Sequence, residues 1–402
     1  MQQNTVASAE EAHQLPSASL VTVVAIATGA LVANLYYAQP LVSAIGPELG
    51  VSAKLAGSVT SVTQIGYGAG LFLLVSLADI VENKRLVLTT LSITVVALIA
   101  AALSTVAAPF FLASFVVGVC STGAQVLIPF ISHLVPAERR GRTVGNIMAG
   151  LLTGIMLARP AALFIAASFG WRAVFWCSAV LMVGILIALA VMMPRHPPKG
   201  RMRYSQIIAS MAGLIVSMPA LRWRSAYQAL MFGAFNMFWT AAPLMLGEQL
   251  GLSQRGIGFF ALAGAGGALS APFAGRLADR GLTQATTLGC MLLVGLGFLA
   301  TGFASAAGTI VGLAVLAFLI DAGVQGNQVV SQRIIFSAAP ETRGRVNAIY
   351  MTITFIGGAI GSLLGTVTYH WGGWTATAGT GTVLGLLMLI LFGLERRTHP
   401  AH

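Results

Sequence analysis

Apolar residues fill most of this chain in long stretches that are interrupted by short polar breaks. A helix that spans a membrane needs about 20 mostly apolar residues. Twelve stretches of roughly this length are present, covering residues 19–45, 54–80, 86–107, 109–134, 142–167, 172–193, 221–247, 255–279, 283–305, 307–334, 344–369 and 373–394. The pattern therefore predicts an all-α membrane protein with twelve transmembrane helices.

The second half of the chain repeats motifs of the first half. The sequence "PAERRGR", ending at Arg142, recurs as "PETRGR", ending at Arg345. The sequence "LAD" ends at Asp79 and again at Asp279. Repeats about 200 residues apart indicate two related structural units. We therefore predict two pseudo-symmetric six-helix bundles.

The longest polar break, at residues 193–206, divides the chain almost in half and is rich in proline and basic residues. It predicts a linker between the two bundles. The expected organisation is a tail at 1–18, a first bundle at 19–193, a basic linker at 194–220, a second bundle at 221–394 and a tail at 395–402.

The composition excludes an ordinary soluble protein, because 57% of the residues are hydrophobic and only 8% are charged, against about a quarter charged in soluble domains. The net charge of +11 does not predict nucleic-acid binding, since the basic residues are spread over short breaks. Cytoplasmic loops retain Lys and Arg. With the N-terminus inside, 18 of the 22 basic residues fall on inner loops and helix ends. We expect a monomer in the inner (plasma) membrane bilayer, with both termini cytoplasmic.

Acidic and basic residues recur after the second helix of each half. In the second half these are Asp279 and Arg280, preceded by Gly275, and in the first half Asp79 and Lys84. The arrangement resembles the G-x-x-x-D-[RK]-x-G-R-[RK] loop of the major facilitator superfamily, although both copies depart from it at other positions. The resemblance covers residues 19–394. It implies that two halves rock about a central cavity and expose it to each side of the membrane in turn.

The charged loop residues suit a gate. A carboxylate at a helix end can accept charge-assisted hydrogen bonds from Arg, Lys or the N–H groups of a neighbouring helix. We expect the loop residues named above, together with Arg140 and Arg343, to hold one conformation closed. The alternative is that they anchor helix ends in the headgroup layer.

In this superfamily the first and fourth helices of each half line the cavity, and the unusual polar residues of this chain lie on those helices. We expect these residues to bind a small-molecule substrate: Asn34, Tyr36, Tyr37, Gln39, Gln125, Asn236, Trp239, Gln325 and Gln328. Spacings of four and three residues place Asp321, Gln325 and Gln328 on one helical face.

Asp321 lies about 21 Å into the tenth stretch at 1.5 Å per residue, close to the middle of the membrane. Exposing its charge to lipid there costs on the order of 3 kcal/mol or more. We expect Asp321 to carry a coupling proton or to contact a cationic substrate. The alternative is a structural carboxylate that is permanently bonded to neighbouring helices.

Arg159 is the second charge inside a predicted span, in "GNIMAGLLTGIMLARPAA". This stretch resembles the antiporter signature G-x8-G-x3-G-P-x2-G-G of the same superfamily only at Gly145 and Gly154, and Arg159 stands where proline is expected. Arg159 could bind an anionic substrate group or neutralise Asp321 during the cycle. A fixed ion pair between the two charges is the alternative.

These observations predict a secondary active transporter that moves a small organic solute and is coupled to protons. No phosphate-binding loop is present, and we expect neither a cofactor nor a metal. The aromatic residues Tyr36, Tyr37, Phe238 and Trp239 favour export of drug-like or amphipathic compounds. Proton-coupled uptake of a nutrient or metabolite is the alternative. A membrane-embedded enzyme or a receptor lacks support, because we find no catalytic constellation and no signalling domain.

Overall fold

The computed structural model describes residues 17–78, 80–195, 203–336 and 342–398. Within these ranges the regular structure is helical, without strands. The first part of the chain contains α1 (Ala18–Ala33), η1 (Gln39–Leu41), α2 (Val42–Glu48), η2 (Ala53–Leu55), α3 (Ser58–Leu77), α4 (Asn83–Leu103), α5 (Ala107–Ser121), α6 (Gly123–Leu134), α7 (Ala137–Phe169) and α8 (Trp171–Met192). The second part contains α9 (Tyr204–Ser217), α10 (Pro219–Glu248), α11 (Gln254–Gly264), η3 (Ala265–Ser270), α12 (Ala271–Asp279), α13 (Thr283–Ala306), α14 (Ile310–Ile335) and α15 (Arg343–Thr398).

The twelve predicted spans are confirmed. Nine helical segments of the described chain are long and apolar enough to cross a membrane. The longest of them, α15, contains two spans, because its backbone leaves the helical conformation at Gly372 and Gly373. Two further spans are broken helices: the first consists of α1, η1 and the beginning of α2, and the eighth consists of α11, η3 and α12.

Proline and glycine account for the breaks. Pro40 lies in η1 and Pro47 lies inside α2, and proline lacks the N–H that continues a helical ladder. Gly373 has a φ of 64°, which glycine adopts without a steric penalty. In the eighth span, a stretch rich in glycine and alanine forms the 3-10 segment η3 before α12 begins.

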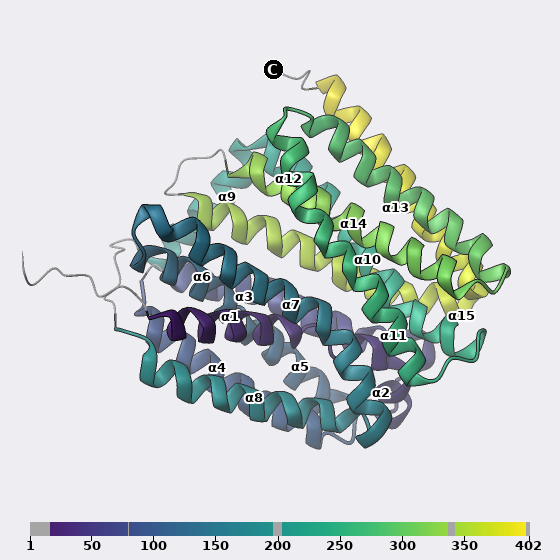
Figure 1. Cartoon of the computed structure of the whole chain (residues 1–402), viewed down its shortest axis with the longest axis horizontal. Helices are drawn as coiled ribbons and strands as arrows, with labels where there is room; N and C mark the ends of the chain where they lie inside the picture. The colour runs from purple at the N-terminus through teal and green to yellow at the C-terminus, as the bar shows by residue number, and fades with distance from the viewer. Residues whose placement is uncertain (1–16, 79, 196–202, 337–341, 399–402) are drawn as a thin grey trace, which may run out of the picture.

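The helices form two bundles that lie side by side, α1–α8 in one and α10–α15 in the other (Figure 1). The first and fifth helices of each bundle cross in the same way. A Cβ atom on Gly29 of α1 would meet the backbone of Gly150 on α7, and one on Gly154 would meet Gly29. In the second bundle, a Cβ atom on Gly361 of α15 would meet the backbone of Gly233 on α10. Small residues permit this close approach, and its recurrence supports the pseudo-symmetry.

We call the membrane face at which α1 begins and α15 ends the basic face, and the other face, where α2 and η2 lie, the opposite face. The two bundles contact each other strongly in the half of the membrane nearer the opposite face. There the N–H of Gly57 on the first bundle donates to Oγ1 of Thr366 at 3.1 Å, and Ser61 Oγ donates to the carbonyl of Ala359 at 2.6 Å.

A second contact joins the bundles between α7 and α11, again near the opposite face. The rings of Phe164 and Phe259 lie 5.2 Å apart with edge-to-face geometry. Arg255 at the start of α11 donates to Ser168 near the end of α7 at 3.4 Å. Figure 1 shows the bundles meeting near α2 and α11. The contacts of α3 with α15 and of α7 with α11 therefore hold the bundles together near the opposite face.

The short helix α9 falls within the predicted linker and is too short to span the membrane. It contacts both bundles near the basic face. Tyr204 donates to the carbonyl of Leu73 in α3 at 3.2 Å, and Arg345 of α15 donates to Ser210 at 2.6 Å. The helix therefore connects the bundles at the basic face in this conformation.

Candidate functional site

Residues from four spans converge around two buried charges between the bundles. Arg159 is on α7, Gln39 is in η1, Trp239 is on α10 and Asp321 is on α14. Arg159 is 3% exposed and Asp321 is 5% exposed. In its helix, Asp321 lies 11 residues after Ile310, which corresponds to about 17 Å at 1.5 Å per residue. The carboxylate is therefore deep inside the span.

Aromatic rings surround the guanidinium of Arg159. Its Cζ atom lies 4.8 Å from the ring centroids of Tyr36 and Phe235 and 4.9 Å from that of Trp239. Its Nε donates to Oε1 of Gln39 at 2.8 Å. Desolvated cation–π contacts are worth about 2 kcal/mol or more each. Ring faces and one amide oxygen thus replace part of the water that the cation loses on burial.

Trp239 connects the two charges. Its indole Nε1–H donates to Oδ1 of Asp321 at 2.9 Å, while its ring face lies against Arg159. Arg159 and Asp321 are not within 4.0 Å of each other in the described structure, whose ion pairs lie elsewhere. The two charges therefore interact across the indole rather than as a direct ion pair.

An amide network joins the bundles beside the charges. Nε2 of Gln39 donates to Oδ1 of Asn236 at 3.0 Å and is 3.3 Å from Oγ1 of Thr240. Gln64 of α3 also donates to Oδ1 of Asn236, at 2.5 Å, and Asn236 donates to the carbonyl of Phe232. Gln64 is not among the residues predicted to bind substrate, although an amide inside an apolar stretch indicates a polar contact there.

Two of the predicted substrate residues point into the first bundle. Asn34 accepts a hydrogen bond from Ser178 of α8 at 2.6 Å and lies against Met182. Tyr37 lines a separate cavity of about 360 Å³ between α1, α7 and α8, together with Leu181. Asn34 and Tyr37 therefore lie apart from the cluster around Arg159 and Asp321.

The remaining predicted substrate residues lie nearer the basic face. Gln125 of α6 donates to the hydroxyl of Tyr67 at 3.3 Å. Gln325 and Gln328 are half-buried and follow Asp321 on the same face of α14, one and two turns further along. Asn327, by contrast, donates to Gln228 of α10 at 2.7 Å. The face of α14 that carries Asp321 thus continues as a line of amides.

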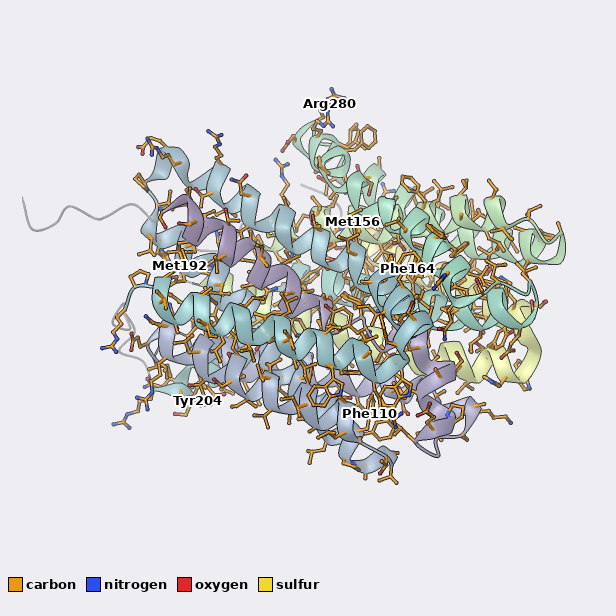
Figure 2. The ribbon with its side chains drawn as sticks, turned by 60° about the horizontal axis from the view of Figure 1, so that its bottom comes forward. Phe110, Met156, Phe164, Met192, Tyr204 and Arg280 are labelled. Carbon is orange, nitrogen blue, oxygen red and sulfur yellow. The ribbon has the colours of Figure 1, made fainter. Side chains whose placement is uncertain are left out.

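The predicted gate residues of the second bundle lie at the basic face. Asp279 forms an ion pair with Arg333 of α14, which also approaches the carbonyl of Gly275 at 3.5 Å. Arg280 is exposed, and Figure 2 shows it projecting from the edge of this bundle. Arg343 is exposed at the start of α15. Local sequence patterns do not pair Arg333 with Asp279, because the two residues are 54 positions apart.

In the first bundle, Lys84 donates to the carbonyl of Met193 at 2.6 Å and so caps the end of α8. Arg140 donates to the carbonyl of Ser132 at 3.0 Å. Asp79 lies outside the described residues. No cluster of three or more His, Cys, Asp or Glu side chains suitable for a metal occurs in the described parts of the chain.

Comparison with known proteins gives the family. The sequence pattern of the Major Facilitator Superfamily matches residues 24–207 and 225–402. The putative uncharacterized transporter YgaY of Escherichia coli strain K12 is 38% identical over 383 residues, which cover 94% of this chain and 96% of that protein. A probable transporter of Streptomyces coelicolor is 33% identical, over 90% of this chain and 85% of that protein. A chloramphenicol resistance protein of Streptomyces lividans is 29% identical over 287 residues, covering 67% and 70% of the two chains.

Solved structures show the same fold at low sequence identity. The D-xylose-proton symporter superimposes with a TM-score of 0.72 at 17% identity, covering 92% of this chain and 96% of the symporter. A bacterial homologue of the human lysosomal transporter Spinster, in an inward-facing and unoccupied conformation, gives a TM-score of 0.72 at 12% identity, covering 94% and 97%. The helical bundles, the repeat and these matches together establish that the chain belongs to the major facilitator superfamily, a family of membrane transporters of small solutes and not of enzymes.

Proposed function

We propose that this protein exports amphipathic, drug-like organic compounds in exchange for protons, with Asp321 as the proton-binding group. The observation that carries the proposal is the placement of Asp321: it is buried deep in its span, bonded to Trp239 and close to Arg159 without a direct ion pair. An ionisable group inside the membrane is by default a candidate for function. The relative named for chloramphenicol resistance supports export as the direction.

Protonation of Asp321 would change the balance of charge at the site. The ionised carboxylate attracts the guanidinium of Arg159 through a medium of low dielectric constant, where Coulomb interactions are strong. The neutral acid loses this attraction and accepts a weaker hydrogen bond from Trp239. Because Arg159 belongs to the first bundle and Asp321 to the second, proton binding alters the force that holds the bundles together. One proton can in this way change the relative populations of two conformations.

The same cluster offers surfaces for an amphipathic substrate. The rings of Tyr36 and Trp239 supply apolar faces, and the amides of Gln39 and Asn236 supply polar groups. Nη2 of Arg159 makes no hydrogen bond within the described protein and is available to an acceptor oxygen of a substrate. Few fixed charges and several ring faces suit a tolerant binding site. Gln325 and Gln328 extend this surface along α14.

We further propose that the basic face is cytoplasmic in the inner (plasma) membrane, which follows from the excess of Lys and Arg at that face. The contacts near the opposite face would then close the site toward the exterior. We expect the ion pair between Asp279 and Arg333 to break when that face closes. Lys84, Arg140, Arg280 and Arg343 lie at the same face and would then form new contacts.

Transport in liposomes with an imposed pH gradient tests the proposal. Purified protein is reconstituted and screened against a panel that includes chloramphenicol, alongside Asp321→Asn and Arg159→Ala. Glu48→Gln is the matched control, since Glu48 is an exposed carboxylate at the opposite face that pairs with Arg172. We expect gradient-driven flux that falls at least about tenfold in Asp321→Asn and is unchanged in Glu48→Gln.

The same assay separates the competing functions. Gradient-driven flux that is identical in Asp321→Asn would remove Asp321 from coupling. Substrate movement in the same direction as the proton would establish uptake by symport, with the same carboxylate as the proton site. Downhill flux that does not respond to the pH gradient would show that the protein is a uniporter.

A further inference from the structure

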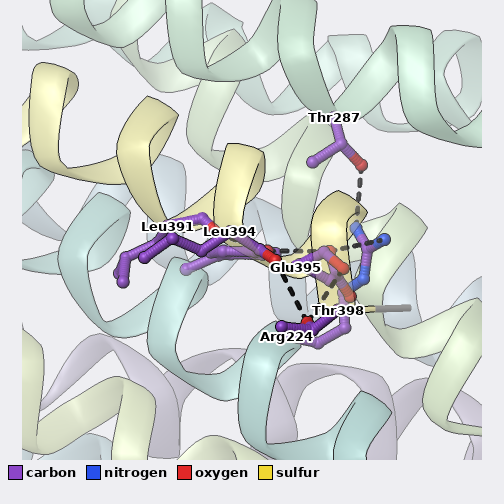
Figure 3. A network of polar contacts seen from close by, with 7 residues as sticks. Arg224, Thr287, Leu391, Leu394, Glu395 and Thr398 are labelled. Atoms are coloured by element: carbon purple, nitrogen blue, oxygen red, sulfur yellow. Dashed lines mark hydrogen bonds and ion pairs between the residues drawn. The ribbon is translucent and has the colours of Figure 1, made fainter. Parts of the chain in front are cut away.

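A second buried arginine lies far from the transport cluster. Arg224 of α10 is 6% exposed and is 15 residues before Trp239, about 22 Å along the helix. Figure 3 shows its contacts with α13 and α15: Nη1 donates to the hydroxyl of Thr287 at 2.9 Å, and Nη2 is 3.9 Å from Oε2 of Glu395. These contacts tie three helices of the second bundle together at the basic face.

Glu395 forms only a long ion pair with Arg224, without a hydrogen bond between them. The 3.9 Å separation exceeds the length of a hydrogen bond. The same carboxylate oxygen accepts a shorter bond of 2.7 Å from the hydroxyl of Tyr227. The hydrogen bond that Arg224 makes in this network is therefore to a neutral hydroxyl. Arg224 therefore retains N–H donors that can bind a second anion.

A cavity of about 750 Å³ adjoins Arg224. Arg396 of α15 also lines it, and within the described residues the lining holds these two arginines and no acidic side chain. Leu288, Ile334 and Phe392 form an apolar part of the wall. The site thus combines two positive charges with an apolar surface.

The position of the cavity indicates the headgroup layer of the bilayer. It lies where α13 begins, at Thr283, and where α14 and α15 end. Helix ends of membrane spans lie at the level of the lipid headgroups. Basic pockets between spans at this level bind the phosphate of anionic lipids. A soluble phosphate compound would gain nothing from Leu288 and Phe392, whereas an acyl chain would.

We propose that this cavity binds one anionic phospholipid of the leaflet at the basic face. Arg224 and Arg396 hold its phosphate by charge-assisted hydrogen bonds, and the first part of an acyl chain packs on Leu288 and Phe392. The bound lipid connects α10, α13 and α15, and so stabilises the second bundle. The site is independent of the Asp321 cluster and of the direction of transport.

Lipid binding to the purified full-length protein tests this inference. Native mass spectrometry from detergent, with phosphatidylglycerol and phosphatidylcholine supplied at equal concentration, measures the affinity for each lipid. We expect the protein to bind phosphatidylglycerol about tenfold more tightly, and to show a higher Tm in its presence. Arg396→Gln should weaken this binding about tenfold. Arg397→Gln is the matched control, because Arg397 is an exposed neighbour that does not line the cavity.

A second variant tests the apolar part of the site without changing its charge. Ala285 lines the cavity on α13, and Ala285→Phe should fill it and weaken lipid binding about tenfold with both arginines in place. Equal effects of Arg396→Gln and Arg397→Gln, or equal affinity for the two lipids, would overturn the proposal. Displacement of the lipid by millimolar inorganic phosphate would show a soluble anion site instead, and would also overturn it.

Discussion

The indole N–H of Trp239 lies 2.9 Å from the carboxylate of Asp321 and donates a hydrogen bond to it. The face of the same ring lies 4.9 Å from the guanidinium of Arg159. One side chain of the second bundle therefore contacts both buried charges, one of which belongs to the first bundle. A substitution at Trp239 can affect the two charges separately, because the N–H at the ring edge contacts Asp321 and the ring face contacts Arg159.

Trp239→Phe removes the N–H donor and keeps an aromatic face for Arg159. A hydrogen bond to a charged group is worth about 1.5–3 kcal/mol, so we expect proton-driven flux to fall about tenfold or more. Flux in liposomes under a pH gradient is the measurement. Trp371→Phe serves as the control, since Trp371 is 80% exposed. Wild-type flux in Trp239→Phe would show that the indole N–H has no part in coupling.

Gln64→Leu removes a hydrogen bond between the bundles, from α3 to Asn236 of α10. Loss of this bond should favour separation of the bundles near the opposite face by about 1 kcal/mol, a shift of about fivefold in the ratio of two conformations. Distances between spin labels at Ser168 and Arg255, which are in contact across the bundles, report this shift. Both labelled positions lie outside the transport cluster.

The control for this experiment is Gln125→Leu, because Gln125 bonds Tyr67 within the first bundle. It should leave the distance distribution unchanged. An identical distribution in Gln64→Leu and the wild type would mean that the Gln64 contact does not contribute to closure.

Gly154→Ala should destabilise the fold by about 1–3 kcal/mol, the usual cost of overpacking. Its Cβ atom would meet the backbone of Gly29 where α7 crosses α1, and backbone cannot move aside as a flexible side chain can. Gly184→Ala is the matched change, since nothing lies near the corresponding Cβ position on α8. Thermal unfolding in detergent compares the two variants. An unchanged Tm in Gly154→Ala would show that α1 and α7 can move apart enough to accommodate a methyl group.

Glu48 should contribute a small pH-dependent stability at the opposite face. The hydrogen bond from Arg172 holds the pKa of Glu48 below its ordinary value of 4.5. A carboxylate with a lowered pKa in the folded state stabilises the protein above its unfolded pKa, and this contribution disappears as the pH falls through the folded pKa. The effect is small because both side chains are exposed.

The measurement is the Tm of the wild type and of Glu48→Gln between pH 7 and pH 3.5. The variant should have a slightly lower Tm at pH 7, and the difference should shrink below about pH 4.5. A difference that grows toward low pH would contradict the predicted sign.

Several features followed from the sequence because they depend on local chemistry. The number of spans follows from the length of apolar stretches and the fixed rise of a helix. The structure has the first span even though Pro40 interrupts its helix, and Gly373 separates the last two spans. The repeated motifs predicted two related bundles. The depth of Asp321 followed from counting residues along one helix, which needs no knowledge of its neighbours.

Only the tertiary structure decided which groups meet. Asn34 and Tyr37 belong to the same polar cluster in sequence as Tyr36 and Gln39, yet the chain turns after α1 and directs Asn34 to α8 and Gln39 to α10. The indole between Arg159 and Asp321 comes from a different helix than either charge. The apolar pattern determines that a helix lies in the membrane. The direction of each polar side chain depends instead on how neighbouring helices pack. This packing is determined by contacts between residues that are far apart in the chain.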